Sequence, residues 1–162
     1  MALAFPSNDI AFDFVQIAAL AGMEIQVSDI DIEELATAHR QPKALPIGKQ
    51  AVYLFMYRDR CLKVGKAGPK SSARYCSQHY GLRAPSTLAK SLIRERGVDG
   101  ATAITDSNVR SWICEHTDRV NFLIPERHGI WAISLLEVFL QCRLRPRFEG
   151  FASQRMLVKI DK

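Results

Sequence analysis

Apolar residues near the start of the chain recur at helical spacing. They fall on one helical face at Ile10, Phe14, Ile17 and Ala21. Asn8 or Asp9 can cap this helix and Gly22 can end it, so we predict a first helix between these points. A second helix is predicted from Ser28 to about His39, because residues 28–31 resemble a capping box with Asp in place of the usual Glu.

The pattern changes to that of β-strands after residue 50. Ala51–Tyr57 and Cys61–Gly65 are rich in β-forming residues, and a plausible polar turn, Arg58–Arg60, separates them. We therefore predict a β-hairpin over residues 51–65. A third strand is predicted over Arg119–Ile124, closed by Pro125.

Helical spacing returns between these strands and after them. Helices are predicted over about residues 71–79, 88–96, 108–116 and 130–143, and a last short strand over 156–160. From the hairpin onward the order is β-β-α-α-α-β-α. This order predicts the α+β class, with a small antiparallel sheet flanked by helices.

Charge divides the 162-residue chain at a linker. Residues 41–48 contain two prolines and break helices at both. Residues 1–48 carry two Lys or Arg and seven Asp or Glu, whereas residues 49–162 carry 20 basic and 10 acidic residues. We interpret 1–48 as an acidic, helical N-terminal extension and 49–162 as the main domain. The basic main domain suits a polyanionic partner such as nucleic acid.

Composition excludes several other classes of protein. The chain is 48% apolar and 24% charged, as in ordinary globular domains, and no apolar run approaches a membrane span. No basic residue precedes the first apolar stretch, which is unlike a signal peptide. The four cysteines form no C-x-x-C pair, so neither a zinc site nor a disulfide framework is indicated. We expect a cytoplasmic protein with no membrane partner.

Two isolated charges lie in apolar segments. Glu137 is the only charged residue of residues 130–142, and a carboxylate there must be solvated, paired or bound to a metal. Ser134 and Gln141 extend it into a polar stripe that can simply face water. Lys63 lies next to a glycine, and Tyr53 of the partner strand could share its face, where an ammonium group can lower the pKa of a phenol. An exposed lysine on an edge strand is the alternative.

Two clusters of residues suit phosphate chemistry. Arg74, Tyr75, His79 and Tyr80 lie on one short helical segment, and the planar fork of arginine bonds two phosphoryl oxygens at once. A solvated helix face is the alternative. A basic patch ends the last helix, at Arg143, Arg145 and Arg147. It can also merely compensate the helix dipole.

Taken in order, these residues resemble the GIY-YIG nuclease superfamily over about residues 49–150. Ala51-Val52-Tyr53 corresponds to the Gly-Ile-Tyr element, and Lys63-Val64-Gly65 to the Tyr-Ile-Gly element of a branch with Lys in place of the second Tyr. Arg74 matches the arginine of the family's first helix. Glu137 matches the metal-binding glutamate of its last long helix.

The resemblance implies an endonuclease that hydrolyses DNA phosphodiester bonds with Mg²⁺ or Mn²⁺. Glu137 would hold the metal. Tyr53 and Lys63 would activate or position the attacking water, and Arg74 would offset charge in the transition state. His79 or Tyr80 could assist proton transfer. The residues expected to hold the DNA backbone are Lys66, Lys70, Arg143, Arg145 and Arg147.

Departures from the family pattern leave two alternatives open. Ala51 replaces the first Gly, Lys63 replaces the second Tyr, and Phe148 or Glu149 stands in place of a terminal Asn. One alternative is a catalytically degenerate module for DNA binding or protein association, and the other is an unrelated α+β domain. Residues 1–48 have no counterpart in the family. They could cover the basic cleft, carry a protein partner, or pack as a helical flank.

Overall fold

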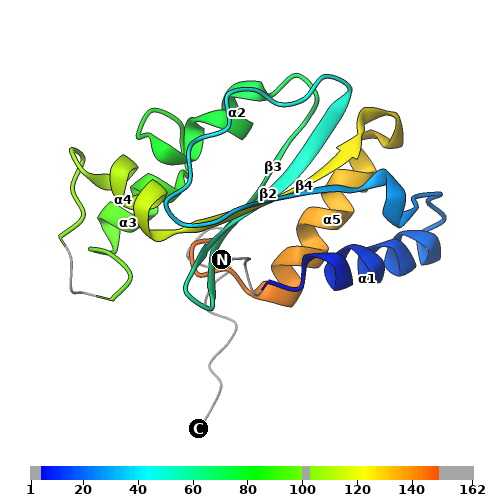
Figure 1. The fold of residues 1–162 in the computed structure, drawn as a ribbon, viewed down its shortest axis with the longest axis horizontal. Helices are drawn as coiled ribbons and strands as arrows, with labels where there is room; N and C mark the ends of the chain where they lie inside the picture. Colours follow the sequence, from blue (N-terminus) through cyan, green and yellow to red (C-terminus); the bar gives the residue numbers. More distant parts are fainter. Residues whose placement is uncertain (1–4, 100–102, 150–162) are drawn as a thin grey trace, which may run out of the picture.

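Strands that are distant in the sequence join one antiparallel sheet in the computed structural model, which describes residues 5–99 and 103–149 (Figure 1). The strand order is β1-β4-β2-β3. The strands are β1 Asp31–Leu35, β2 Lys49–Tyr57, β3 Arg60–Ala67 and β4 Asp118–Pro125. The α-helices are α1 Ser7–Leu20, α2 Ser72–Cys76, α3 Leu88–Arg94, α4 Val109–His116 and α5 Gly129–Leu144. Short 3₁₀ turns η1 Val27–Asp29, η2 Gln78–Tyr80 and η3 Glu126–His128 connect them. The predicted α+β class is confirmed.

The predicted hairpin forms β2 and β3, each slightly longer than expected. Tyr53 lies opposite Gly65 and Phe55 opposite Lys63, with an irregularity between Phe55 and Met56. The predicted third strand is β4, which pairs antiparallel with β2 and places Asn121 opposite Tyr53. Pairing on both sides makes β2 a central strand, and it is buried along almost its whole length.

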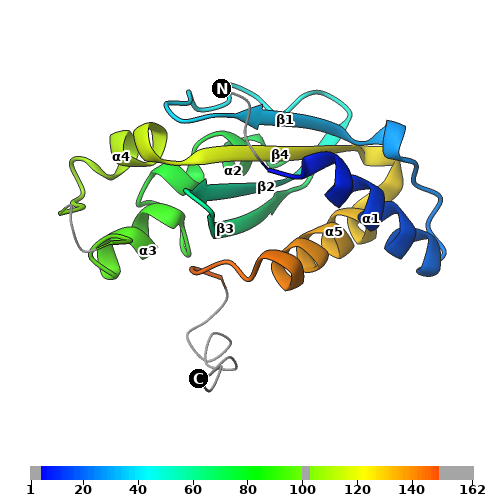
Figure 2. The same cartoon turned by 60° about the horizontal axis from the view of Figure 1, so that its bottom comes forward.

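Two separate cores lie on the two faces of the sheet. Helices α1 and α5 cover one face, where Phe14 and Leu136 pack against Val52 and Phe122. Helices α2, α3 and α4 cover the other, where Tyr75 and Leu88 pack in one core with strand residues such as Phe55 (Figures 1 and 2). Because strand side chains alternate between faces, Tyr53 and its neighbours on the second face form a surface distinct from the α5 face.

The prediction of a helix over residues 28–39 is wrong. The capping box that forms links Gln26 and Asp29, and it serves only the single turn of η1. The chain then extends as β1, whose residues pair with β4 from Asp31 opposite Leu123 to Leu35 opposite Arg119. Pairing with β4 outweighs the weak helical signal of this acidic segment. Part of the predicted N-terminal extension therefore belongs to the sheet (Figure 2).

The other predicted helices form with small differences. The helix expected over residues 71–79 divides at Ser77 into α2 and η2, while α1, α3, α4 and α5 form close to their predicted bounds. The predicted cap of α1 is wrong, because its N-cap is Pro6 and Asn8 and Asp9 lie inside the helix. The strand predicted over 156–160 lies outside the described residues. Within residues 5–99 and 103–149, no helix combines the length and apolar character needed to cross a membrane.

Candidate active site

Tyr53 lies at the centre of β2, and its ring rests directly on Gly65 of β3. The Tyr53 side chain is completely buried. A Cβ atom placed on Gly65 would come within 2.8 Å of Cε2 of the tyrosine ring. Because Gly65 has no side chain, it leaves the space in which the Tyr53 ring lies.

We expect Gly65→Ala to lower the free energy of unfolding by about 1–3 kcal/mol, because the new methyl group forces Tyr53 out of its position. Urea denaturation measures this change. Gly68→Ala is the matched control, since a Cβ there would meet only Ser71 Oγ at 4.0 Å. Equal stability of the two variants would contradict the packing described for Tyr53.

The Tyr53 hydroxyl reaches the helix that carries Arg74. It donates a hydrogen bond to the Arg74 carbonyl oxygen at 3.3 Å, and the Arg74 side chain is exposed. Burial raises the pKa of Tyr53 to about 12, although the charges of Arg74 and Arg119 act to lower it. The expected lowering of this pKa by a lysine is thus wrong, because desolvation outweighs the nearby cations. At neutral pH Tyr53 is a protonated phenol.

His79 packs against Tyr53 as a neutral ring. The two ring centroids are 5.3 Å apart, and the Leu88 backbone N–H donates to His79 Nδ1 at 3.3 Å. Burial, followed by the charges of Lys63, Arg74 and Arg119, lowers the pKa of His79 to about 3. A ring that binds no proton at neutral pH is a weak candidate for general acid catalysis.

The buried imidazole makes stability fall in acid. Unfolded His79 gains its proton near pH 6.5 and the folded protein only near pH 3, so the unfolded state binds more protons between these values. The stability due to neutral His79 is complete above pH 6.5 and is lost as pH falls. We expect a slope of about 1 kcal/mol per pH unit between pH 6 and 5 from urea denaturation. His79→Asn should flatten it, and an unchanged slope would contradict this environment.

Lys63 lies on the same sheet face as Tyr53, two residues from the glycine that the tyrosine covers. Its ammonium group donates to the Phe148 carbonyl oxygen at 2.9 Å and lies 3.8 Å from the Glu149 carboxylate. Glu149 also accepts from the Val64 backbone N–H at 3.2 Å. Lys63 is buried. These contacts tie β3 to the segment after α5, which is a structural role.

Glu137 projects from α5 toward the edge strand β3. Its Oε2 lies 2.7 Å from Lys66 Nζ, and its side chain is 15% exposed. Lys66 Nζ also donates to Ser134 Oγ at 3.3 Å, so the predicted polar stripe of α5 binds a cationic side chain. The Glu137 charge acts to raise the pKa of Tyr53, which places the two groups within electrostatic reach.

Glu137 offers a hard divalent cation one carboxylate, which is the ligand type that such an ion prefers. Lys66 Nζ, 2.7 Å from Glu137 Oε2, occupies that carboxylate. Over the described part of the chain, no three His, Cys, Asp or Glu side chains group as metal ligands. A Mg²⁺ ion held by one carboxylate would complete its shell with water and substrate phosphate, as this ion commonly does.

The predicted DNA-binding residues divide into two sets. Three are engaged within the protein: Lys66 with Glu137, Arg143 with Asp13, and Arg147 with the Val98 carbonyl oxygen. Lys70 and Arg145 are exposed. Arg145 has a left-handed backbone, with a φ of 47°, where it ends α5.

Arg119 of β4 is a buried charge that the sequence reasoning missed. It is 0% exposed, and its guanidinium lies 4.8 Å from the ring centroids of both Tyr53 and Tyr75. It donates to Asn121 Oδ1 at 2.8 Å, the Tyr75 carbonyl oxygen at 2.6 Å and the Tyr80 hydroxyl at 3.2 Å. A signal was present, because the polar residues 119 and 121 alternate with Val120 and Phe122.

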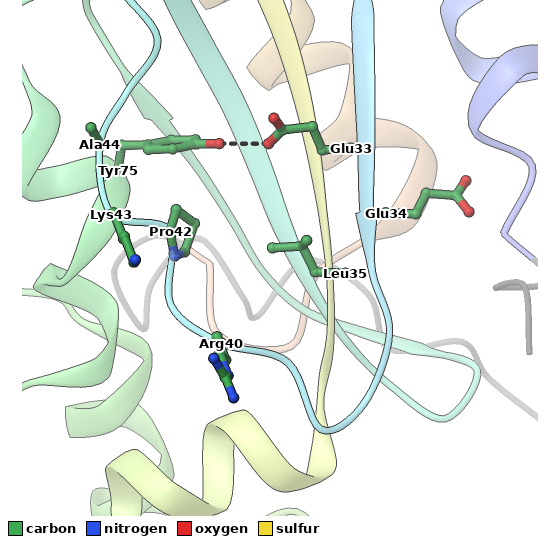
Figure 3. Close-up of a pocket in the computed structure, with 8 residues that line it drawn as sticks. All are labelled: Glu33, Glu34, Leu35, Arg40, Pro42, Lys43, Ala44 and Tyr75. Atoms are coloured by element: carbon green, nitrogen blue, oxygen red, sulfur yellow. Dashed lines mark hydrogen bonds between the residues drawn. The ribbon is translucent and has the colours of Figure 1, made fainter.

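Tyr75 joins this cluster to a surface pocket of about 450 Å³. In Figure 3 the Tyr75 hydroxyl points at Glu33, to which it donates at 3.0 Å, while Glu34 points away. Arg40 and Lys43 lie on the opposite, loop side of the pocket. The pocket therefore combines acidic and basic walls beside the helix that carries Arg74.

The structure thus gathers Tyr53, Gly65, Arg74 and His79 into one cluster, with Glu137 in electrostatic reach, and anchors Lys63 to the chain after α5. No protein-family model, curated protein or solved structure matches the chain.

Proposed function

We propose that the protein is a divalent-cation-dependent endonuclease of the GIY-YIG type that hydrolyses DNA phosphodiester bonds. One observation supports this proposal. The Tyr53 hydroxyl of β2 donates a hydrogen bond to the Arg74 carbonyl oxygen of α2, and Glu137 of α5, which pairs with Lys66 on the other face of the sheet, is near enough for its charge to act on Tyr53. In phosphoryl transfer, a phenol can orient the substrate, a guanidinium can stabilise developing negative charge, and a carboxylate can bind a cation.

The roles follow from the charge state of each group. A cation at Glu137 would supply Lewis-acid stabilisation of the phosphate oxygens. Arg74, with its exposed side chain, would bind non-bridging oxygens and offset their developing charge. Tyr53 stays protonated, so it would donate a hydrogen bond rather than remove a proton. Because the Tyr53 side chain is fully buried and its hydroxyl bonds to the Arg74 carbonyl oxygen, a substrate would reach this hydroxyl only if α2 moved.

A second candidate is a module that binds DNA without cutting it. The burial of Tyr53 and the pairing of Glu137 with Lys66 favour this alternative, because both groups are withdrawn from solvent or occupied. Exposed Lys70, Arg74 and Arg145 would still attract phosphates.

A cleavage assay distinguishes the two functions. Purified protein is incubated with supercoiled plasmid and with single-stranded DNA, in Mg²⁺, in Mn²⁺ or in EDTA. We expect cation-dependent nicking of at least one substrate. DNA binding in an electrophoretic shift without cleavage under any of these conditions would instead identify a binding module.

A further inference from the structure

The ion pair between Lys66 and Glu137 occupies the group that a cation would bind. The 2.7 Å contact involves side chains that are 33% and 15% exposed, and Ser134 accepts a second hydrogen bond from the same ammonium group. Partial burial reduces the screening of this pair by solvent and salt. Val52 lies opposite Lys66, which places the lysine on the α5 face of the edge strand.

We infer that Lys66 is a latch on Glu137: it competes with a divalent cation for this carboxylate and is released when a phosphate takes its place. This inference rests on the proposed function at one point, which is the binding of a divalent cation to Glu137. Two positive charges cannot share one carboxylate oxygen without repelling each other, so either one weakens binding of the other. A phosphate gives the flexible lysine another anion. DNA binding and cation binding are then coupled, each strengthening the other.

The first test measures the cation alone, without DNA. Free Mn²⁺ is followed by electron paramagnetic resonance during titration of the full chain. We expect Lys66→Met to bind Mn²⁺ about tenfold more tightly than the unsubstituted protein, and Lys66→Gln to behave alike if the Met variant fails to fold. Lys90→Met, an equal charge change at an exposed position of α3, should leave the affinity unchanged. Addition of Glu137→Gln to Lys66→Met should abolish the gain.

The second test measures DNA binding in EDTA, by fluorescence anisotropy of a labelled oligonucleotide. Glu137→Gln frees Lys66 and should bind DNA several-fold more tightly, beyond the small general gain from losing one negative charge. Glu115→Gln on α4 gives the size of that general gain. In a Lys66→Met background, Glu137→Gln should produce only the general gain.

The outcomes separate the latch from the endonuclease. Equal Mn²⁺ affinity with and without Lys66, or a DNA-binding gain that persists in the Lys66→Met background, overturns the latch even if the protein cuts DNA. The expected affinity changes without any cleavage support the latch and count against the endonuclease.

Discussion

Glu137→Gln is expected to lower cation-dependent DNA cleavage by about 10³-fold or more, because it removes the negative charge proposed to hold the cation. The substitution preserves the shape of the side chain and removes only the charge that holds Lys66. Fold and packing should therefore survive. The measurement is the nicking rate of supercoiled plasmid at saturating Mg²⁺.

The control is Glu115→Gln, the same chemical change at an exposed position of α4. It should leave both the nicking rate and the thermal unfolding temperature unchanged. Cleavage by the Glu137→Gln protein at the rate of the unsubstituted protein would remove Glu137 from the site. Partial cleavage that needs a much higher Mg²⁺ concentration would support the role of Glu137 in binding the cation.

Arg119→Met is expected to lower the free energy of unfolding by about 3 kcal/mol, which corresponds to a fall of roughly 6–12 °C in Tm. Methionine fills part of the space but donates no hydrogen bonds. Asn121 Oδ1, the Tyr75 carbonyl oxygen and the Tyr80 hydroxyl each lose their contact with this guanidinium. Buried polar groups that lose their partners account for most of the cost.

Arg119→Lys tests the same network with the charge retained. One ammonium group cannot reach three acceptors arranged for a guanidinium fork, so we expect this variant also to lose stability, though less. Arg60→Met, at an exposed position of β3, is the matched control and should change stability little. A loss below about 1 kcal/mol for Arg119→Met would show that the aromatic rings around this position tolerate an apolar side chain.

The local pattern of apolar and polar residues was sufficient to predict most of the helices and strands. The hairpin, β4 and the helices from α3 onward were predictable because each carries strong periodicity and clear turn residues. β1 was not, because its acidic sequence has little strand character of its own and is held by pairing with β4. Pairing partners this distant in sequence leave no local mark.

The candidate site was predictable in composition but not in contacts. The order of residues indicated Tyr53, Arg74 and Glu137, and the Tyr53 hydroxyl does bond to the Arg74 carbonyl oxygen. The ion pair of Glu137 with Lys66, a residue expected to bind DNA, was not foreseen. The protonation of Tyr53 could not be foreseen, because desolvation depends on everything packed around the ring. Arg119 was missed since a single arginine in a strand is commonly exposed, and its burial depends on aromatic residues from three other segments.

The place of β1 at the edge of β4 affects the order in which the protein assembles. As the chain leaves the ribosome, the β2–β3 hairpin has all its residues early, and it can pair locally. β1 emerges before either strand, yet its partner β4 is made only after β2, β3 and helices α2 to α4. β1 must therefore wait unpaired until β4 is made, and loop-closure entropy makes such distant pairing slow. Its acidic residues repel one another during this delay and help protect the waiting strand from aggregation.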